Sequence, residues 1–558
     1  MKKLVSLVLA VMLMLSCFML AGAEGNADIV DEQGRIVKYG EPVHLTAYFC
    51  RSMPRFNEGD DINHNVWINY YKENYNIELE IVMLANGDDY KQKMTAAIAS
   101  KNLPDLMYLD GNNYTALAKA GKLADVTDLF DLYCGDILRK TLMGKDGMVF
   151  QQSYVNGRLY GFTKTKGMSV PGSQLYIRKD WLKKLNLEEP KNFDDVVKIA
   201  YAFANDDPDG NGQKDTYGLG LNNDMLNATD FGSLQGVIAA YGGFTNTWIV
   251  NEETGKVEYG ALNEGTRKGL ETLASMYADG VIDKEFGIKK PETVGEDVAS
   301  GKIGMYYGIN GGNLTYLYDC MLNDPEADWT VLNAMDLEGN IAVTGSAYTL
   351  QDWFAVNAEC EHPEALFILA NAFQNIINNP LTTTEELNTY GLDPDTGVNK
   401  ASYPYFACDP AESKDFEYCR EIRAVANGEA DESVLFPEAL KYYEGVKRYE
   451  ANDKKWNPDD PSAWQYNMNY GFPSSIQNYL EAYEAGKIIF SAWFGTETPT
   501  MIKKMSNLKD LQAETFTKII TGAVGIEEFD NFVNTWNKQG GSDITDEVND
   551  WYVEHYAK

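Results

Sequence analysis

The chain has 558 residues and a formal net charge of −35 at pH 7, with 83 acidic side chains against 48 basic ones. So acidic a surface repels nucleic acid and anionic lipid, which excludes functions that depend on basic patches. The length far exceeds one ordinary domain of ~100–150 residues, so at least two domains or lobes are expected.

The N-terminus has the pattern of a secretory signal peptide over residues 1–23. Two lysines precede an apolar run over 4–20, and Ala21-Gly22-Ala23 supplies the small residues of a cleavage site. The mature chain is therefore expected to be secreted, extracytoplasmic and associated with the cell surface. A lipid anchor at Cys17 is the alternative. It is not favoured because Leu15, two positions earlier, should be a small residue for lipoprotein processing.

Strands and helices are predicted to alternate after the leader. Strands are expected at 43–50, 77–84 and 103–110, separated by helical stretches at 66–75 and 89–102. This alternation predicts a mostly parallel sheet in an α/β fold, and ligands bind such sheets at the carboxyl ends of the strands. Arg51 and Asp110 fall at two of these ends.

The same alternation continues to the C-terminus. Strands are expected at 157–165 and 174–187, a helix at 192–206, helices around 264–280, a strand and a Gly-rich loop within 300–312, a strand at 348–357, a helix at 362–374 and a helical tail.

The loop 205–218 gathers oxygen donors at alternate positions. They are Asp207, Asp209, Asn211, Gln213 through its backbone carbonyl, and Asp215. An EF-hand loop has this spacing, with a glycine at the sixth position and a bidentate glutamate at the twelfth. Gly212 fits the sixth position, but Gly218 stands at the twelfth, so another residue or water must complete the shell. The spacing predicts a structural Ca²⁺ site, and a metal-free Asx-rich turn is the alternative.

Catalytic motifs are missing from the sequence. It has only four histidines and contains no HExxH, G-x-S-x-G or phosphate-binding glycine loop, and its cysteines lack zinc-site spacing. A glycosidase-like carboxylate pair cannot be recognised among so many acidic residues. We therefore expect no enzymatic activity, with a secreted glycoside hydrolase or lyase as the alternative.

Several motifs in chain order resemble the extracellular solute-binding proteins of ABC importers, in the sugar-binding family 1. The subgroup that they are most similar to includes alginate- and oligosaccharide-binding lipoproteins. The motifs are 103-LPDLMYLD-110, 156-NGRLYGF-162, 175-LYIRKDWLKKLNLEEPKNFDD-195, 205-NDDPDGNGQKDTYGL-219, 300-SGKIGM-305 and 491-SAWFGTETPTM-501, with a tail over 515–522 and 539–552.

The resemblance implies a two-lobe, periplasmic-binding-protein-like α/β fold of type II. The lobes are discontinuous, joined by a hinge, and hold the ligand between them. Lobe 1 is expected at 24–165 with about 320–390, and lobe 2 at 166–319 with about 391–558. In alginate-binding relatives an acidic neighbour of the last loop aspartate completes the calcium shell. Thr216 stands there in this chain, and either its hydroxyl or a water is the substitute we expect.

The resemblance also implies function. It predicts a monomer that captures an oligosaccharide and delivers it to ABC transporter permease subunits, and a chemosensory sugar binder is the alternative. We expect ligand contacts from Arg51, Asp110, Asn112, Tyr176, Arg178, Tyr307 and Asn310, with Trp353 and Trp493 as stacking platforms. Neutral and anionic saccharides both remain open, because Arg51, Arg55, Lys164, Lys166 and Arg178 offer cations for a uronide.

Overall fold

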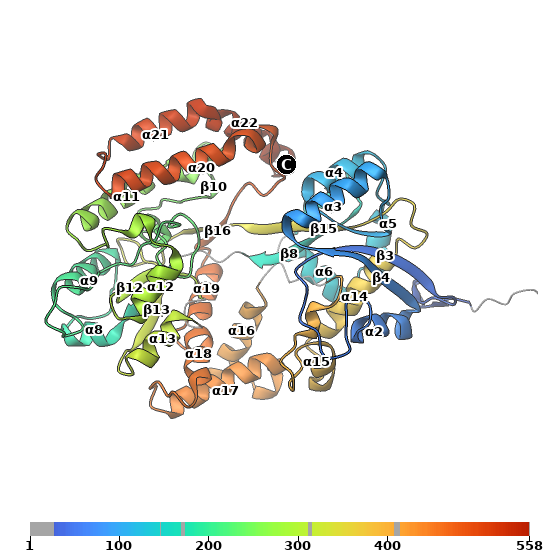
Figure 1. Ribbon diagram of the computed structural model, residues 1–558, viewed down its shortest axis with the longest axis horizontal. Coiled ribbons are helices and arrows are strands. Elements are labelled where there is room, and N and C mark those ends of the chain that lie inside the picture. The colour runs from blue at the N-terminus through green and yellow to red at the C-terminus, as the bar shows by residue number, and fades with distance from the viewer. Residues whose placement is uncertain (1–26, 145–146, 169–172, 311–314, 407–412, 557–558) are drawn as a thin grey trace, which may run out of the picture. The chain divides into compact units, whose positions relative to one another are not determined.

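The computed structural model describes residues 27–144, 147–168, 173–310, 315–406 and 413–556 (Figure 1). The predicted signal peptide and Cys17 lie outside these residues. The chain divides into two compact units, the first formed by Met1–Thr165 with Leu350–Pro410 and the second by Lys166–Thr349 with Ala411–Lys558. Both units are therefore discontinuous in sequence.

Two of the three passages between the units differ from the predicted positions near 320 and 390. After 320 the chain stays in the second unit because β13 (Trp329–Leu332) is hydrogen-bonded to β9 (Gln174–Arg178). After 390 it stays in the first unit because Tyr405 and Phe406 are buried in that unit's core.

The first unit is built on a five-stranded sheet in the order β4-β3-β5-β15-β8. β3 runs parallel to β4 and β5, whereas β15 is antiparallel to β5. The elements of this unit are β1 (Ile29–Val30), β2 (Ile36–Lys38), β3 (Val43–Cys50), α2 (Val66–Tyr75), β4 (Ile77–Ala85), α3 (Gly87–Ser100), β5 (Leu106–Leu109), α4 (Gly111–Lys119), α5 (Thr127–Tyr133), α6 (Asp136–Met143), α7 (Met148–Gln151), β6 (Tyr154–Val155), β7 (Arg158–Leu159), β8 (Gly161–Met168), β15 (Tyr348–Val356), α14 (Ala365–Ile377) and α15 (Thr384–Tyr390). The strand–helix alternation predicted for 43–110 is confirmed.

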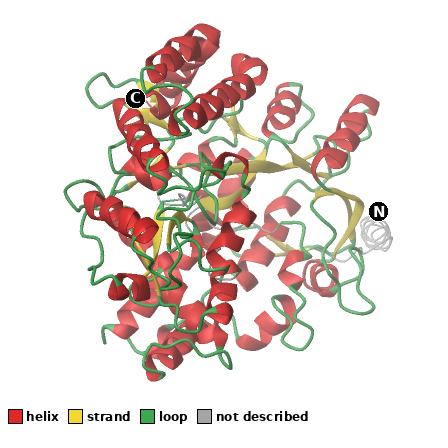
Figure 2. Cartoon of the chain, turned by 60° about the vertical axis from the view of Figure 1, so that its left-hand side comes forward, coloured by secondary structure: helices red, strands yellow, loops and turns green. Residues whose placement is uncertain are grey.

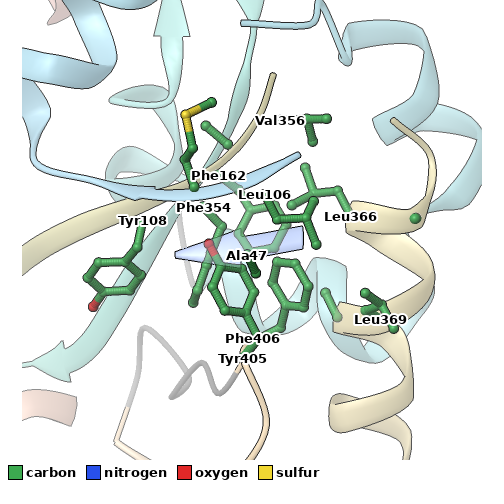
Figure 3. Close-up of a cluster of buried hydrophobic side chains, with 14 of the residues drawn as sticks. Ala47, Leu106, Tyr108, Phe162, Phe354, Val356, Leu366, Leu369, Tyr405 and Phe406 are labelled. Atoms are coloured by element: carbon green, nitrogen blue, oxygen red, sulfur yellow. The ribbon is translucent and has the colours of Figure 1, made fainter. Parts of the chain in front are cut away.

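The core of the first unit lies between this sheet and α14. Figure 3 shows Ala47 of β3, Leu106 of β5 and Phe354 of β15 packed toward Leu366 and Leu369 of α14, with Tyr405 and Phe406 alongside. The alternating pattern of β3, in which every second residue is buried, supplies this face. Residues from both chain segments of this unit, Met1–Thr165 and Leu350–Pro410, thus pack in one hydrophobic core.

The second unit contains a three-stranded sheet in the order β12-β9-β13, with β9 antiparallel to both neighbours. Helices account for most of the regular structure of the chain (Figure 2). The elements of this unit are β9 (Gln174–Arg178), α8 (Lys179–Lys184), α9 (Phe193–Asn205), α10 (Gln235–Ala239), β10 (Trp248–Val250), β11 (Val257–Tyr259), α11 (Glu264–Ala278), α12 (Pro291–Ala299), β12 (Met305–Gly308), α13 (Tyr316–Asn323), β13 (Trp329–Leu332), β14 (Thr344–Ser346), α16 (Lys414–Ala426), α17 (Pro437–Ala451), α18 (Pro461–Tyr470), α19 (Ser475–Glu484), β16 (Ile488–Phe490), α20 (Pro499–Ile520), α21 (Glu528–Trp536) and α22 (Ser542–Tyr556).

The strand predicted at 174–187 is only partly correct. β9 ends at Arg178, and the chain continues as the helix α8. Trp181 on this helix has no exposed surface and packs its ring edge-to-face on Phe203 of α9. The helical tail predicted for the C-terminus is confirmed by α20, α21 and α22. Within the described part of the chain, no helix has the length and apolar character needed to cross a membrane.

Candidate functional site

The oxygen-rich loop follows α9 and turns sharply. Asp207, Gly210 and Gly212 all have positive φ angles, of 49°, 76° and 79°. The Asp207 carboxylate accepts the backbone N–H groups of Asn211 at 3.1 Å and Gly212 at 3.0 Å. The loop thereby wraps its backbone around its own first carboxylate, which is the local geometry that the spacing predicted.

The carboxylates of Asp207, Asp209 and Asp215 lie close together, and in the described part of the chain no cationic side chain pairs with them. Partial burial, together with the charges of Asp215 and Asp207, raises the pKa of Asp209. In the described part of the chain no lysine or arginine forms an ion pair with Asp207, Asp209 or Asp215, and Lys214 Nζ donates to Asn205 Oδ1 instead, at 2.7 Å. Hard oxygen donors with surplus negative charge fit a cation such as Ca²⁺.

The Asn211 side chain stands between two of these aspartates. Its Nδ2 donates to Asp209 Oδ2 at 2.6 Å and to Asp215 Oδ1 at 3.2 Å. Its Oδ1 accepts the N–H of Gln213 at 2.7 Å. To bind a metal ion, Asn211 would have to present its Oδ1 to the ion. Its side-chain amide would therefore have to rotate so that Oδ1 takes the place of Nδ2. Among the described residues, no group of three or more acidic, His or Cys side chains is placed to hold a metal ion.

Two further positions of the loop are committed to the fold. Thr216 is buried and its hydroxyl donates to the carbonyl oxygen of Phe203 at 2.7 Å, so it ties the loop to the end of α9. This differs from the predicted calcium-ligand role. At Gly218 an added Cβ would lie 1.9 Å from the carbonyl oxygen of Ala200 and 2.7 Å from Val281 Cγ1. The twelfth loop position therefore has no room for a glutamate, which explains its absence.

The carboxyl edge of the first unit's sheet carries three predicted ligand residues. Arg51 directly follows β3, and its guanidinium donates to the carbonyl oxygen of Ser402 and lies 5.5 Å from the Phe49 ring centroid. Burial lowers the pKa of Arg51. Asp110 follows β5 and caps α4 by accepting the N–H of Asn113 at 2.9 Å. Asn112, in the first turn of α4, is exposed.

Three predicted ligand residues are core residues instead. Tyr176 and Tyr307 have no exposed surface and belong to the core of the second unit. Trp353 is 4% exposed and stacks on Tyr114 with ring centroids 5.5 Å apart. Tyr176 and Tyr307 lie on β9 and β12, in which every residue is buried, so these two strands are covered on both faces and lack a buried-exposed alternation.

Arg178 is also interior, contrary to the predicted ligand role. Its side chain is 1% exposed and forms a fork with Asp180, with Nε–Oδ1 and Nη2–Oδ2 distances of 2.7 and 2.6 Å. Its Nη2 also lies 2.7 Å from Asp324 Oδ2. The Arg178 cation is therefore paired with two carboxylates within the second unit.

Asn310 and Trp493 remain at the surface of the second unit. Asn310 is half-buried just after β12. Trp493 is half-buried and packs edge-to-face on Trp551, with ring centroids 4.8 Å apart. Arg55 is exposed, whereas the side chains of Lys164 and Lys166 lie outside the described residues.

Sequence reasoning missed Asp230, which lies over the carboxyl end of β12. The N–H of Ile309 donates to the carbonyl oxygen of Thr229 at 3.1 Å, and an added Cβ on Gly308 would lie 2.1 Å from the carbonyl oxygen of Asp230. Gly308 thus allows the 229–231 segment to approach the strand end. In the sequence, the one indication that another backbone segment comes close to β12 is Gly308, the glycine that ends the apolar run 305-MYYG-308.

The family model for the bacterial extracellular solute-binding protein matches residues 60–376, which is more than half of the chain. The chain belongs to this family. The matched segment begins after β3 and includes β4, β5, the oxygen-rich loop and β12.

Two curated relatives match parts of this solute-binding protein. It is 28% identical over 233 residues to the polygalacturonan/rhamnogalacturonan-binding protein YtcQ of Bacillus subtilis, covering 42% of this chain and 44% of the relative. It is 33% identical over 208 residues to the fructooligosaccharide ABC transporter substrate-binding protein FusA of Streptococcus pneumoniae, covering 35% and 38%. The chain thus spans less than half the length of these relatives in the matched segments.

Solved structures share the fold over most of the chain. The alginate-binding protein AlgQ2, solved without calcium ion, has a TM-score of 0.53 and 15% identity, and covers 92% of this chain and 98% of its own. An EF-hand mutant of FusA with fructo-nystose has a TM-score of 0.51 and 19% identity, covering 92% and 99%. The periplasmic-binding-protein-like α/β fold predicted for this solute-binding protein is confirmed. The descriptions of these two structures refer to a calcium ion for AlgQ2 and to an EF-hand for FusA.

Proposed function

We propose that the chain is a secreted, monomeric binding protein that captures an oligosaccharide and delivers it to the permease subunits of an ABC importer. The family match over 60–376 carries this proposal. The two curated relatives, which are named for polygalacturonan/rhamnogalacturonan and for fructooligosaccharides, support the saccharide class. We propose Arg51, Asp110, Asn112, Asn310 and Trp493 as ligand contacts, since each lies at or near the surface of its unit.

A binding protein leaves its ligand unchanged, and this separates it from a hydrolase or lyase. We expect the melting temperature of the mature protein to rise with an oligosaccharide ligand, since ligand at ~100 times its Kd adds about 2.7 kcal/mol to stability. Chromatography of the same mixture after prolonged incubation should return the sugar intact. Shortened or unsaturated products would make the chain an enzyme. No shift with any saccharide would remove the saccharide assignment.

We further propose that the 205–218 loop holds a structural Ca²⁺ ion. Asp207, Asp209 and Asp215 would supply carboxylate oxygens, Asn211 its amide oxygen and Gln213 its backbone carbonyl. The missing twelfth ligand would be replaced by water, because Gly218 has no space for a side chain. The ion would neutralise the crowded carboxylates and fix the link between α9 and the segment that follows.

Calcium removal is expected to lower the melting temperature of the apo protein. Chelation followed by Ca²⁺ at ~100 times its Kd should restore about 2.7 kcal/mol. Asp209→Asn should abolish this response, while Asp206→Asn, an exposed neighbour outside the alternating set, should keep it. A melting curve that is the same with chelator and with Ca²⁺ would leave the loop as a metal-free turn.

A further inference from the structure

Asp230 carries a carboxylate at the carboxyl end of β12. It is half-buried, and in the described part of the chain no cation or hydrogen-bond donor pairs with its carboxylate. Burial, with a smaller contribution from the negative charge of Glu292, raises the pKa of Asp230. A buried carboxylate normally receives donors or a cation, because removing it from water is costly. Asp230, which is only half-buried, therefore keeps acceptor capacity that the described residues do not use.

The groups that face Asp230 are tyrosines from three different elements. The negative charge of Asp230 raises the pKa of Tyr176 on β9, Tyr306 on β12 and Tyr479 on α19, in each case after burial as the main cause. The rings of Tyr176 and Tyr306 stack with centroids 5.0 Å apart and planes 7° apart. Both rings are fully buried.

The backbone holds Asp230 firmly in this place. The N–H groups of Gly232 and Ser233 both donate to the carbonyl oxygen of Tyr307 at 3.0 Å. Phe231, the next residue, is buried against Tyr306 with ring centroids 5.0 Å apart. A fixed carboxylate with free acceptor capacity at a strand end is suited to receive donors from a ligand.

We propose that Asp230 contacts the ligand, accepts hydrogen bonds from the hydroxyl groups of a neutral oligosaccharide, and excludes uronic-acid sugars by charge repulsion. This deepens the proposed function and rests on it. Vicinal hydroxyls of a sugar ring can donate to both oxygens of one carboxylate, and hydrogen bonds to a charged acceptor are the stronger kind. A carboxylated sugar would place a second negative charge beside an uncompensated one.

Calorimetric titration of the wild-type protein and of Asp230→Asn tests this proposal. The probes are neutral kestose, maltotriose and xylotriose, and anionic trigalacturonate. We expect a neutral probe to bind the wild-type protein, and Asp230→Asn to weaken that binding by about ten-fold or more, as the loss of a charged hydrogen bond does. Asp224→Asn is the matched control, because Asp224 is an exposed aspartate of the same segment whose carboxylate already accepts Asn227 Nδ2 at 2.7 Å. Its affinity should stay that of the wild type.

The melting temperature of the apo protein separates a ligand role from a structural role. Asp230→Asn should melt at the wild-type temperature or above it, since the substitution removes a half-buried charge that the described residues do not pair. A structural aspartate would instead give a lower melting temperature when replaced.

Each outcome decides the proposal. Weakened binding of a neutral sugar with an unchanged or higher melting temperature supports it. Neutral binding that Asp230→Asn leaves intact overturns it, as does binding of trigalacturonate alone, and in both cases the proposed function stands. If no saccharide binds the wild-type protein, the proposed function fails and Asp230 loses its role with it.

Discussion

Replacing Arg178 with methionine is expected to lower the free energy of unfolding by about 3 kcal/mol, because removing one partner of a buried ion pair strands the other charge. Arg178 joins β9 to Asp180 on α8 and to Asp324, which follows α13. Its guanidinium also lies 5.0 Å from the Trp181 ring centroid and 5.9 Å from that of Trp329. Methionine keeps much of the volume but leaves Asp180, whose side chain is 15% exposed, without its partner.

Urea unfolding measures this loss, with Arg448→Met as the matched control. Arg448 pairs with Asp460 at 2.8 Å, but its side chain is 47% exposed. Exposed pairs contribute about 0–1 kcal/mol, so the control should be close to the wild type. If Arg178→Met were as stable as the wild type but had lost ligand binding, the structural role would be wrong. Arg178 would then be a ligand contact, as the sequence predicted.

Giving the oxygen-rich loop the glutamate that an EF-hand has at its twelfth position is expected to damage the protein. Gly218 donates its N–H to the carbonyl oxygen of Val281 at 2.8 Å, and its Cα faces the backbone of Ala200 in α9. Any Cβ there meets backbone, which cannot move aside as a flexible side chain can. Both Gly218→Glu and Gly218→Ala should therefore destabilise the fold by about 3 kcal/mol or more, the upper range for overpacking.

Thermal and urea unfolding of these variants should be compared with Gly287→Ala. At Gly287 an added Cβ would meet only Thr517 Cγ2, at an ordinary 3.5 Å. That variant should unfold within about 0.5 kcal/mol of the wild type. If Gly218→Glu were as stable as the wild type and bound Ca²⁺ more tightly, the twelfth position would be an accessible ligand site after all.

The elements of the first unit follow directly from the sequence. The buried-exposed alternation of 43-VHLTAYFC-50 and the strand–helix order that follows it are local signals, and they place Arg51 and Asp110 at strand ends as predicted. The spacing of the oxygen-rich loop is also local, and it predicted the turn that the structure contains.

The predicted ligand residues were less accurate because burial depends on partners distant in sequence. The sequence around Arg178 does not indicate that its guanidinium donates to Asp324, which is far away along the chain. Tyr307 is in the core because Gly236 allows its ring to lie directly against α10, where an added Cβ would lie 2.2 Å from the ring. Asp230 was missed because one aspartate among 83 acidic residues has no distinguishing pattern until its missing counter-charge is seen.

Calorimetric titration of the mature protein with neutral oligosaccharides, followed by recovery of the sugar, tests the central claim most directly. The account predicts one saturable site per chain and an unaltered sugar after prolonged incubation. A sugar that is cleaved, or saturation by no saccharide at all, would contradict it.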